Sequence, residues 1–157
     1  MTSTKKPYRP GKTPSKGQLA GTEQLRVLCK NRAAWKFTSL GTWGIRDVRN
    51  KPGTMSQHAT GRAYDAQYTS RAAALSACKW FAANSDELGI ALINDYMFGG
   101  YGRTWICDRA AWKTHTSNTI GIRGNWIHIE LHARYANMTA AEYFAAWKSV
   151  PAPPKPI

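Results

Sequence analysis

Two histidines and one aspartate in this chain have the types and spacing that suit a metal centre. His58 and Asp65 lie seven positions apart in the stretch SQHATGRAYDAQY, and His128 follows well downstream in the run WIHIE. Two imidazole nitrogens and one carboxylate oxygen give Zn²⁺ three protein ligands and leave a fourth position for water. That composition is typical of a catalytic site, because a structural zinc site is closed by a fourth protein ligand. The sequence therefore predicts a Zn²⁺ cofactor held by His58, Asp65 and His128.

The residues around the first two candidate ligands form a recognisable pattern. Ser56, His58, Gly61, Ala63 and Asp65 spell S-x-H-x-x-G-x-A-x-D, in which the small Gly61 and Ala63 let the chain turn toward one ion. This pattern resembles the signature of the zinc D-Ala-D-Ala carboxypeptidase and L-alanyl-D-glutamate endopeptidase family, which includes the vancomycin-resistance dipeptidases and many bacteriophage endolysins. The resemblance covers residues 40–132. It implies a LAS-type (D-Ala-D-Ala peptidase and hedgehog-like) fold and zinc-dependent hydrolysis of peptidoglycan stem peptides.

The resemblance also implies roles for individual residues. By that likeness His58, Asp65 and His128 would be the zinc ligands, and Ser56 would line the substrate cleft. Arg46 in WGIRDVRN would bind a carboxylate or carbonyl oxygen of the substrate, a role that suits the planar guanidinium group.

The source and partners are also expectations from the resemblance. The segment GYGRTWICDRAAWK is similar to a Trp- and Arg-rich segment of actinobacteriophage relatives. This similarity points to a phage-encoded protein that either leaves the host cytoplasm for the cell wall or belongs to a virion tail. The expected partners are bacterial peptidoglycan and, in the second case, other phage tail proteins.

One position departs from the family pattern. An acidic residue three positions before the last zinc ligand is the family's general base, and Asn125 stands there in this chain. An amide has no basic lone pair at neutral pH, and losing a general base costs on the order of 10²- to 10⁴-fold in rate. Glu130 would share a strand face with His128 and His132, where it is expected to orient His128 or to replace the base. Two functions stay open: a zinc peptidase with weakened or rewired catalysis, and a catalytically silent virion or wall-binding protein.

The charge balance restricts the partners. With 22 Lys and Arg against 9 Asp and Glu, the net charge of +13 predicts attraction to a polyanion, and anionic wall polymers fit the peptidoglycan hypothesis. A nucleic-acid binder is the alternative that charge alone would motivate. No zinc-finger spacing, RNP-like motif or bZIP heptad occurs, so no specific nucleic-acid partner is expected. No apolar run is long enough to cross a membrane. The three cysteines, Cys29, Cys78 and Cys107, are expected to be reduced and structural.

The elements that must position these residues follow from the hydrophobic pattern. Helical spacing predicts a helix over 22–37 with Thr22 as its N-cap, a second from Ser70 to Gly89, and a third that begins at Thr139. Alternation predicts a short strand within 43–48, a hairpin from IALIND and YGRTWIC, and a strand over 125–135. Helices and antiparallel strands segregated in this way indicate an α+β domain, an antiparallel sheet with flanking helices.

The terminal segments differ from the body in composition. Residues 1–20 are basic and contain three prolines, which predicts a flexible basic arm before a zinc peptidase-like domain at 21–150. Residues 151–157 form a proline-rich, extended tail. Neither terminal segment is expected to contribute to the core.

Overall fold

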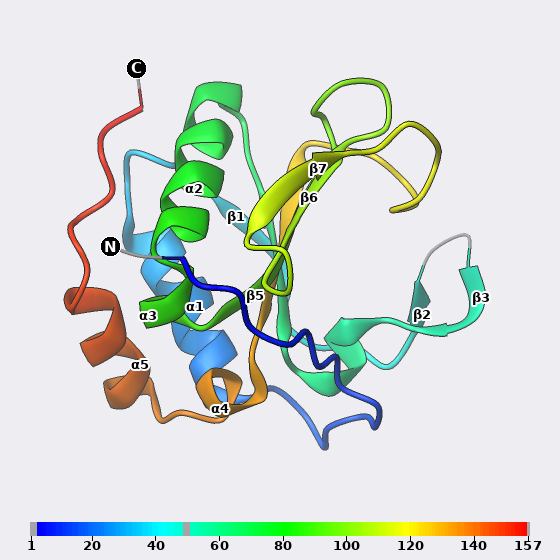
Figure 1. Cartoon of the computed structure of the whole chain (residues 1–157). Helices are drawn as coiled ribbons and strands as arrows, with labels where there is room; N and C mark the ends of the chain where they lie inside the picture. The colour runs from blue at the N-terminus through cyan, green and yellow to red at the C-terminus, as the bar shows by residue number, and fades with distance from the viewer. Residues whose placement is uncertain (1–2, 49–50, 157) are drawn as a thin grey trace.

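The computed structural model describes residues 3–48 and 51–156, and its centre is an antiparallel sheet (Figure 1). Six strands form this sheet in the order β1-β4-β8-β5-β6-β7, and every neighbouring pair is antiparallel. A smaller sheet pairs β2 with β3. The strands are β1 (Thr38–Gly41), β2 (Asp47–Val48), β3 (Lys51–Met55), β4 (Ala63–Gln67), β5 (Ile90–Asp95), β6 (Arg103–Ile106), β7 (Ala111–Thr114) and β8 (Trp126–Leu131).

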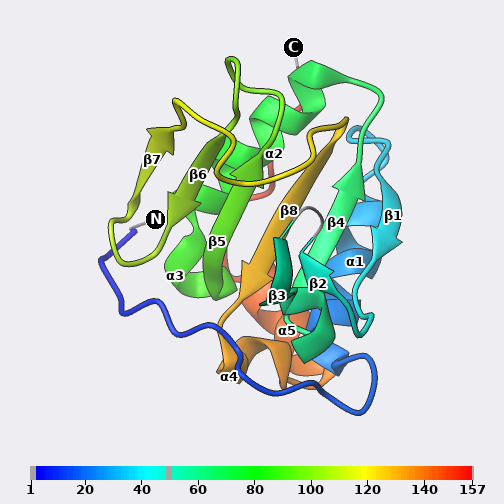
Figure 2. The same ribbon diagram turned by 90° about the vertical axis from the view of Figure 1, so that its right-hand side faces the viewer.

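The helices gather on one side of the six-stranded sheet. Figures 1 and 2 show α1, α2, α3 and α5 on that side and the β2–β3 hairpin on the other. The helices are α1 (Ala20–Asn31), the 3-10 helix η1 (Gln57–Thr60), α2 (Arg71–Ala83), α3 (Ser85–Leu88), α4 (Ala133–Ala136) and α5 (Ala140–Lys148). The predicted α+β architecture, an antiparallel sheet with flanking helices, is therefore confirmed.

Alternation along β8 separates the core from the site. Ile127 and Ile129 are fully buried and belong to the hydrophobic core between sheet and helices. Successive side chains of a strand point to opposite faces, so His128 and Glu130 point to the face away from the helices. Packing of the two isoleucines in the core thereby fixes the strand that carries His128 and Glu130.

Capping residues fix the ends of the helices that the sequence predicted. Ser70 accepts a hydrogen bond from the Ala73 amide at the start of α2, and Thr139 forms a capping box with Glu142 at the start of α5. The prediction for the first helix is wrong at both ends. Thr22 is not its N-cap but lies inside α1, which begins at Ala20 and ends at Asn31. A helix cannot continue to residue 37 because Lys36 has a positive φ of 52°.

The strand predictions also need correction at their ends. The strand predicted over 125–135 stops at Leu131, because His132 turns the chain into α4 and donates its backbone N–H to the Gly89 carbonyl. His132 therefore does not continue the strand face of His128 and Glu130. Only Asp47–Val48 of the predicted strand within 43–48 is a strand, and β1, β3, β4 and β7 were not predicted.

Both terminal segments pack against the body, which corrects the expectation that neither contributes to the core. Residues 3–19 contain no helix or strand, yet Tyr8 and Leu19 pack against the hydrophobic core. In Figures 1 and 2 this dark blue segment runs past the sheet toward η1. At the other end, the Pro151 carbonyl accepts a hydrogen bond from Trp80 Nε1 at 2.9 Å, and Pro153 is buried.

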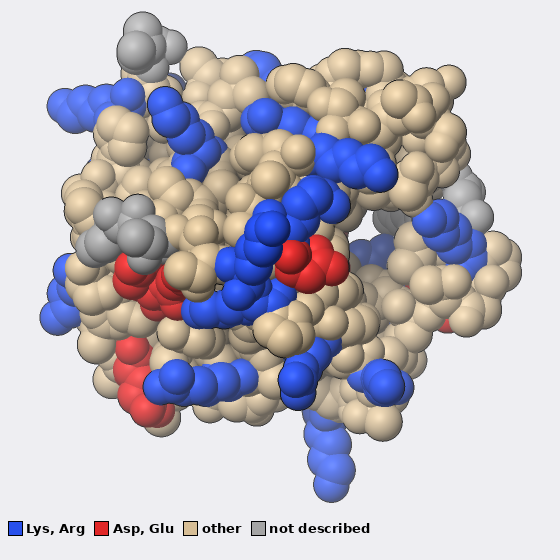
Figure 3. All heavy atoms as spheres, viewed as in Figure 1, with Lys and Arg blue, Asp and Glu red and all other residues tan. Residues whose placement is uncertain are grey.

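Basic side chains cover more of the face seen in Figure 3 than acidic ones do. Figure 3 shows a band of Lys and Arg across the face seen in Figure 1, with few acidic groups among them, as the net charge of +13 implies. Among the described residues, no helix combines the length and apolar character needed to cross a membrane.

Replacing Gly61 by alanine is expected to lower the free energy of unfolding by about 1–3 kcal/mol, because a non-glycine residue is strained in the left-handed conformation. Gly61 ends η1 with a φ of 73°, and a Cβ there would lie 2.7 Å from Leu19 Cγ. Urea denaturation measures the loss. Gly100→Ala is the matched control, because Gly100 has no positive φ and open space around its Cα; equal stability of the two variants would contradict the prediction.

Candidate metal centre

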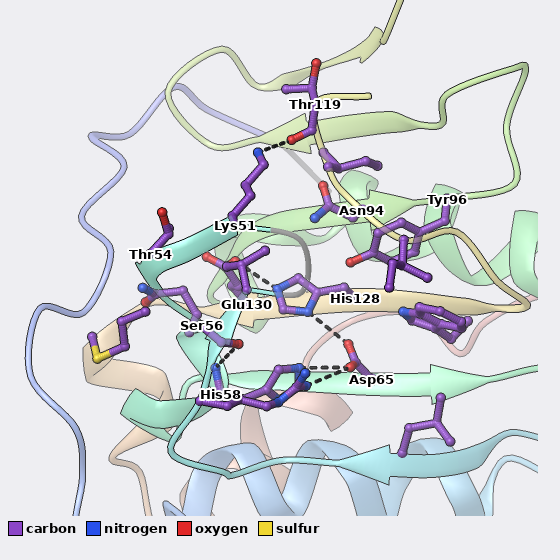
Figure 4. Close-up of a pocket in the computed structure, with 18 of the residues that line it drawn as sticks. Lys51, Thr54, Ser56, His58, Asp65, Asn94, Tyr96, Thr119, His128 and Glu130 are labelled. Carbon is purple, nitrogen blue, oxygen red and sulfur yellow. Dashed lines mark hydrogen bonds and ion pairs between the residues drawn. The ribbon is translucent and has the colours of Figure 1, made fainter. Parts of the chain in front are cut away.

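Three segments bring His58, Asp65 and His128 together. Asp65 on β4 and His128 on β8 are direct partners in the antiparallel register, so their side chains share one face of the sheet. His58 lies in η1, whose first turn is capped by Ser56 Oγ accepting from the His58 amide at 3.3 Å. One ligand atom from each of the three residues lies within 4.8 Å of the others, and all three residues are buried. Figure 4 shows the three side chains pointing toward one another, and this group could hold a metal ion.

The contacts inside the group fit a metal ion. His128 Nδ1 lies 2.9 Å from Asp65 Oδ1, and His58 Nε2 lies 2.9 Å from Asp65 Oδ2. The second contact lacks hydrogen-bond geometry, so His58 Nε2 is buried without a hydrogen-bond partner among the described residues. A buried polar atom without a hydrogen-bond partner lowers the stability of the fold. An ion between the three side chains would give that nitrogen a partner.

Burial and neighbouring charges shift the pKa of each group. Burial alone would raise the pKa of Asp65, but the contacts with His128 and His58 hold it well below its usual range. Burial lowers the pKa of His58. It would lower that of His128 too, but Tyr96, Asp65 and Glu130 raise the pKa of His128 well above its usual value. Asp65 is therefore ionised at neutral pH, as a metal ligand must be.

Glu130 lies on the far side of His128 from Asp65. Its Oε2 is 2.9 Å from His128 Nε2, and its Oε1 accepts a hydrogen bond from the Tyr8 hydroxyl at 2.5 Å. Both carboxylate oxygens are thus engaged. Of the two roles expected for Glu130, the resemblance favoured orienting His128 over replacing the general base, and this geometry also favours the orienting role.

The group opens onto a cavity of about 480 Å³ that Arg46 and Ser56 help to line. Arg46 Nη2 lies 3.9 Å from Asp65 Oδ2, and the Arg46 side chain is 42% exposed. The structure therefore brings both residues expected to bind substrate to the wall of the cavity that contains the candidate ligands.

Asn125 is not brought into this site. Its side chain is exposed and does not line the cavity. Its backbone carbonyl accepts a hydrogen bond from the Tyr68 amide at 2.9 Å, which ties the start of β8 to the end of β4. The role that the structure gives Asn125 is a backbone contact between neighbouring strands.

Several residues of the cavity wall were missed from the sequence. Asn94 pairs with His128 across β5 and β8, and Tyr96 packs on Trp126 with ring centroids 5.2 Å apart. Asn94 is a polar residue near the end of the apolar run IALIND, but only the strand order puts it beside His128. Lys51 and Thr119 also line the cavity, and the Lys51 ammonium donates to the Thr119 carbonyl across it (Figure 4).

Comparisons with known proteins give no relative. No family model matches the chain, and neither the curated proteins nor the solved structures include a match. The chemical interpretation of the site therefore depends on its own geometry: a buried group of two histidines and one aspartate at the wall of a cavity.

Proposed function

We propose that this chain is a zinc metallopeptidase of the D-Ala-D-Ala carboxypeptidase type with a LAS-type fold. Its substrates would be the stem peptides of bacterial peptidoglycan, and its role phage cell-wall lysis or entry. The single observation that carries the proposal is the convergence of His58, Asp65 and His128 beside a cavity. His58 and Asp65 occupy the ligand positions of the pattern that begins at Ser56, and His128 follows in the run WIHIE.

The ligand set suits zinc. Imidazole nitrogens and one carboxylate are typical ligands of catalytic Zn²⁺, and three protein ligands leave one position open. A bound Zn²⁺ supplies Lewis acidity, which polarises a carbonyl group and acidifies water. The open position would face the cavity, since the helices and the core lie on the other side of the sheet.

The chain's own residues would bind and orient the peptide. Arg46 presents a planar guanidinium group that can bind a carboxylate through two parallel hydrogen bonds. Ser56 is buried at the cavity wall, where its hydroxyl caps η1 and so fixes the backbone of His58. Glu130 holds the His128 ring and keeps its Nε2 turned away from Asp65.

The cavity offers no free general base. Among the described residues, the acidic side chains that line it are Asp65 and Glu130, and contacts with histidines or Tyr8 engage both. Proton transfer by a positioned base typically contributes about 10²- to 10⁴-fold. We therefore expect slow hydrolysis compared with an enzyme of the same type that has this acid.

The alternative proposal is a catalytically silent virion or wall-binding protein that keeps the zinc centre. The exposed amide of Asn125, where the family has its acid, favours this alternative. The net charge of +13 suits adsorption to anionic wall polymers in either case.

Purified peptidoglycan distinguishes the two functions. We expect the wild type loaded with Zn²⁺ to release new amino termini slowly, and chelator-treated protein to release none, because substrate polarisation requires the metal. Mass spectrometry of the released peptides identifies the bond that is cleaved.

Asn125→Asp and Arg46→Ala complete this experiment. Arg46→Ala is expected to lower kcat/KM about tenfold or more through the lost contact with substrate. Hydrolysis by Asn125→Asp alone would mean that the natural chain is the silent binding protein. If neither the wild type nor Asn125→Asp hydrolyses peptidoglycan, the peptidase proposal is contradicted.

A further inference from the structure

We infer that Tyr8, in the N-terminal segment, is a positioning residue of the metal centre that acts on His128 through Glu130. The inference rests on the proposed function, since it takes His128 as a zinc ligand. It gives the segment before α1 a part in the site, although the segment lies far from the ligands in the sequence.

The hydrogen bonds run in series from Tyr8 to the candidate ligand. The Tyr8 hydroxyl donates to Glu130 Oε1 at 2.5 Å across 122 residues of sequence. Glu130 Oε2 lies 2.9 Å from His128 Nε2, and the other ring nitrogen, Nδ1, faces Asp65. Glu130 is buried, so these two contacts replace the hydration of its carboxylate.

In the neutral ring of His128, the series fixes which nitrogen carries the proton. A carboxylate that accepts a hydrogen bond on each oxygen has no proton to donate, so His128 Nε2 must be the donor to Glu130. The lone pair of a neutral ring is then on Nδ1, the atom beside Asp65. Ligand histidines in metal sites are commonly fixed in this way by a carboxylate on the other ring nitrogen.

Tyr8 is itself held in place by backbone contacts on both sides. The Lys6 amide donates to the Cys107 carbonyl at 2.9 Å, and the Arg9 carbonyl accepts from Arg62 Nη2 at 2.8 Å. Arg62 is buried and also donates through Nε to the Leu131 carbonyl at the end of β8. The guanidinium group thus joins the segment to the strand that carries His128 and Glu130.

A second connection joins the segment to the other histidine. The Gly11 amide donates to Gln57 Oε1 at 2.7 Å, and Gln57 Nε2 donates to the Gly11 carbonyl at 3.1 Å. Gln57 immediately precedes His58 in η1. The segment that follows Tyr8 is therefore bound to both elements that supply the histidines.

Removing only the hydroxyl group tests the inference. Tyr8→Phe keeps the ring and its packing but leaves Glu130 Oε1 without its donor. We expect the dissociation constant for Zn²⁺ to rise about tenfold, at the lower end of the 10- to 100-fold effect of losing such outer partners. Competition with a chromophoric chelator measures the constant, and the absorption bands of Co²⁺-loaded protein report the ligand geometry separately from any activity.

A double-mutant cycle separates positioning through Glu130 from a general packing effect. Glu130→Gln is expected to weaken Zn²⁺ binding about 10- to 100-fold. Adding Tyr8→Phe to it should cause little further loss, because the two residues act in series. Tyr101→Phe is the matched control, with a ring that is 46% exposed, and should bind Zn²⁺ as the wild type does.

Each outcome bears on a specific claim. Wild-type affinity in Tyr8→Phe, or losses that simply add in the double variant, would overturn the inference and leave the proposed function intact. A wild-type protein that binds no Zn²⁺ would overturn both. Circular dichroism of each variant confirms that the comparison is between folded proteins.

Discussion

Asp95→Ala is expected to lower the free energy of unfolding by about 1.5–3 kcal/mol, because it removes a buried carboxylate from hydrogen bonds with two charged groups that are partly exposed. Asp95 ends β5 with 0% exposure and accepts two hydrogen bonds from Arg71, at 2.7 and 3.0 Å. Arg103 Nε donates to the same carboxylate at 3.1 Å. The carboxylate thus connects the first residue of α2 to β5 and β6, and the substitution leaves two guanidinium groups without it.

Chemical denaturation in urea measures this loss. Asp108→Ala is the control, because Asp108 is an exposed acid near the same strands and should change stability by less than about 0.5 kcal/mol. A loss below about 1 kcal/mol in Asp95→Ala would show that water replaces the carboxylate at no large cost. Asp95 pairs with Ile127 in the register, so its side chain lies on the face of the sheet opposite His128 and takes no part in the candidate metal centre.

Zn²⁺ at about a thousandfold excess over its dissociation constant is expected to raise the free energy of unfolding by about 4 kcal/mol. The reason is that η1, β4 and β8 bring the three candidate ligands together only in the folded chain. Thermal unfolding with Zn²⁺ and with excess chelator measures the difference. The His58→Ala variant should show the same unfolding midpoint in both conditions.

A wild-type midpoint that does not respond to Zn²⁺ would contradict this expectation. An equal response in His58→Ala would mean that the ion binds elsewhere on the chain. Metal-induced stabilisation is independent of catalysis, so it would be seen in the peptidase and in the silent binding protein alike.

Local chemistry made the main helices predictable from sequence. Ser70 and Thr139 cap their helices through their own side chains, and Gly89 ends α3 in the left-handed conformation. The single helix predicted from Ser70 to Gly89 is wrong in one respect, because Asn84 divides it into α2 and α3. The end of α1 was not predictable in this way, because Trp35 and Phe37 continue the apolar pattern although they reach the core from an irregular segment. Tertiary packing there overrides helical spacing.

The candidate ligands were predictable because short motifs carry them. The S-x-H-x-x-G-x-A-x-D pattern placed His58 and Asp65 seven residues apart, and a turn and a strand suffice to bring them together. Tyr8 could not be found in this way. Its partner Glu130 is 122 residues distant, and a basic, proline-containing segment gives no local signal of a fixed conformation.

Asn125 shows the limit of transferring a role along a motif. Its position in the sequence suggested a place beside the metal, but its side chain is exposed and its carbonyl bonds to Tyr68. The cavity wall instead contains Asn94 and Tyr96, which the strand order brings beside His128. Strand order depends on long-range pairing, which no short motif encodes.

Metal content is the most direct test of the metal centre. After loading with Zn²⁺ and dialysis, elemental analysis should find one zinc ion per wild-type chain and none in His58→Ala. His115→Ala should keep its zinc, because His115 hydrogen-bonds to Thr104 and is not one of the three grouped residues. A wild-type chain without stoichiometric zinc, or a His58→Ala chain that retains it, would contradict the assignment of His58, Asp65 and His128 as ligands.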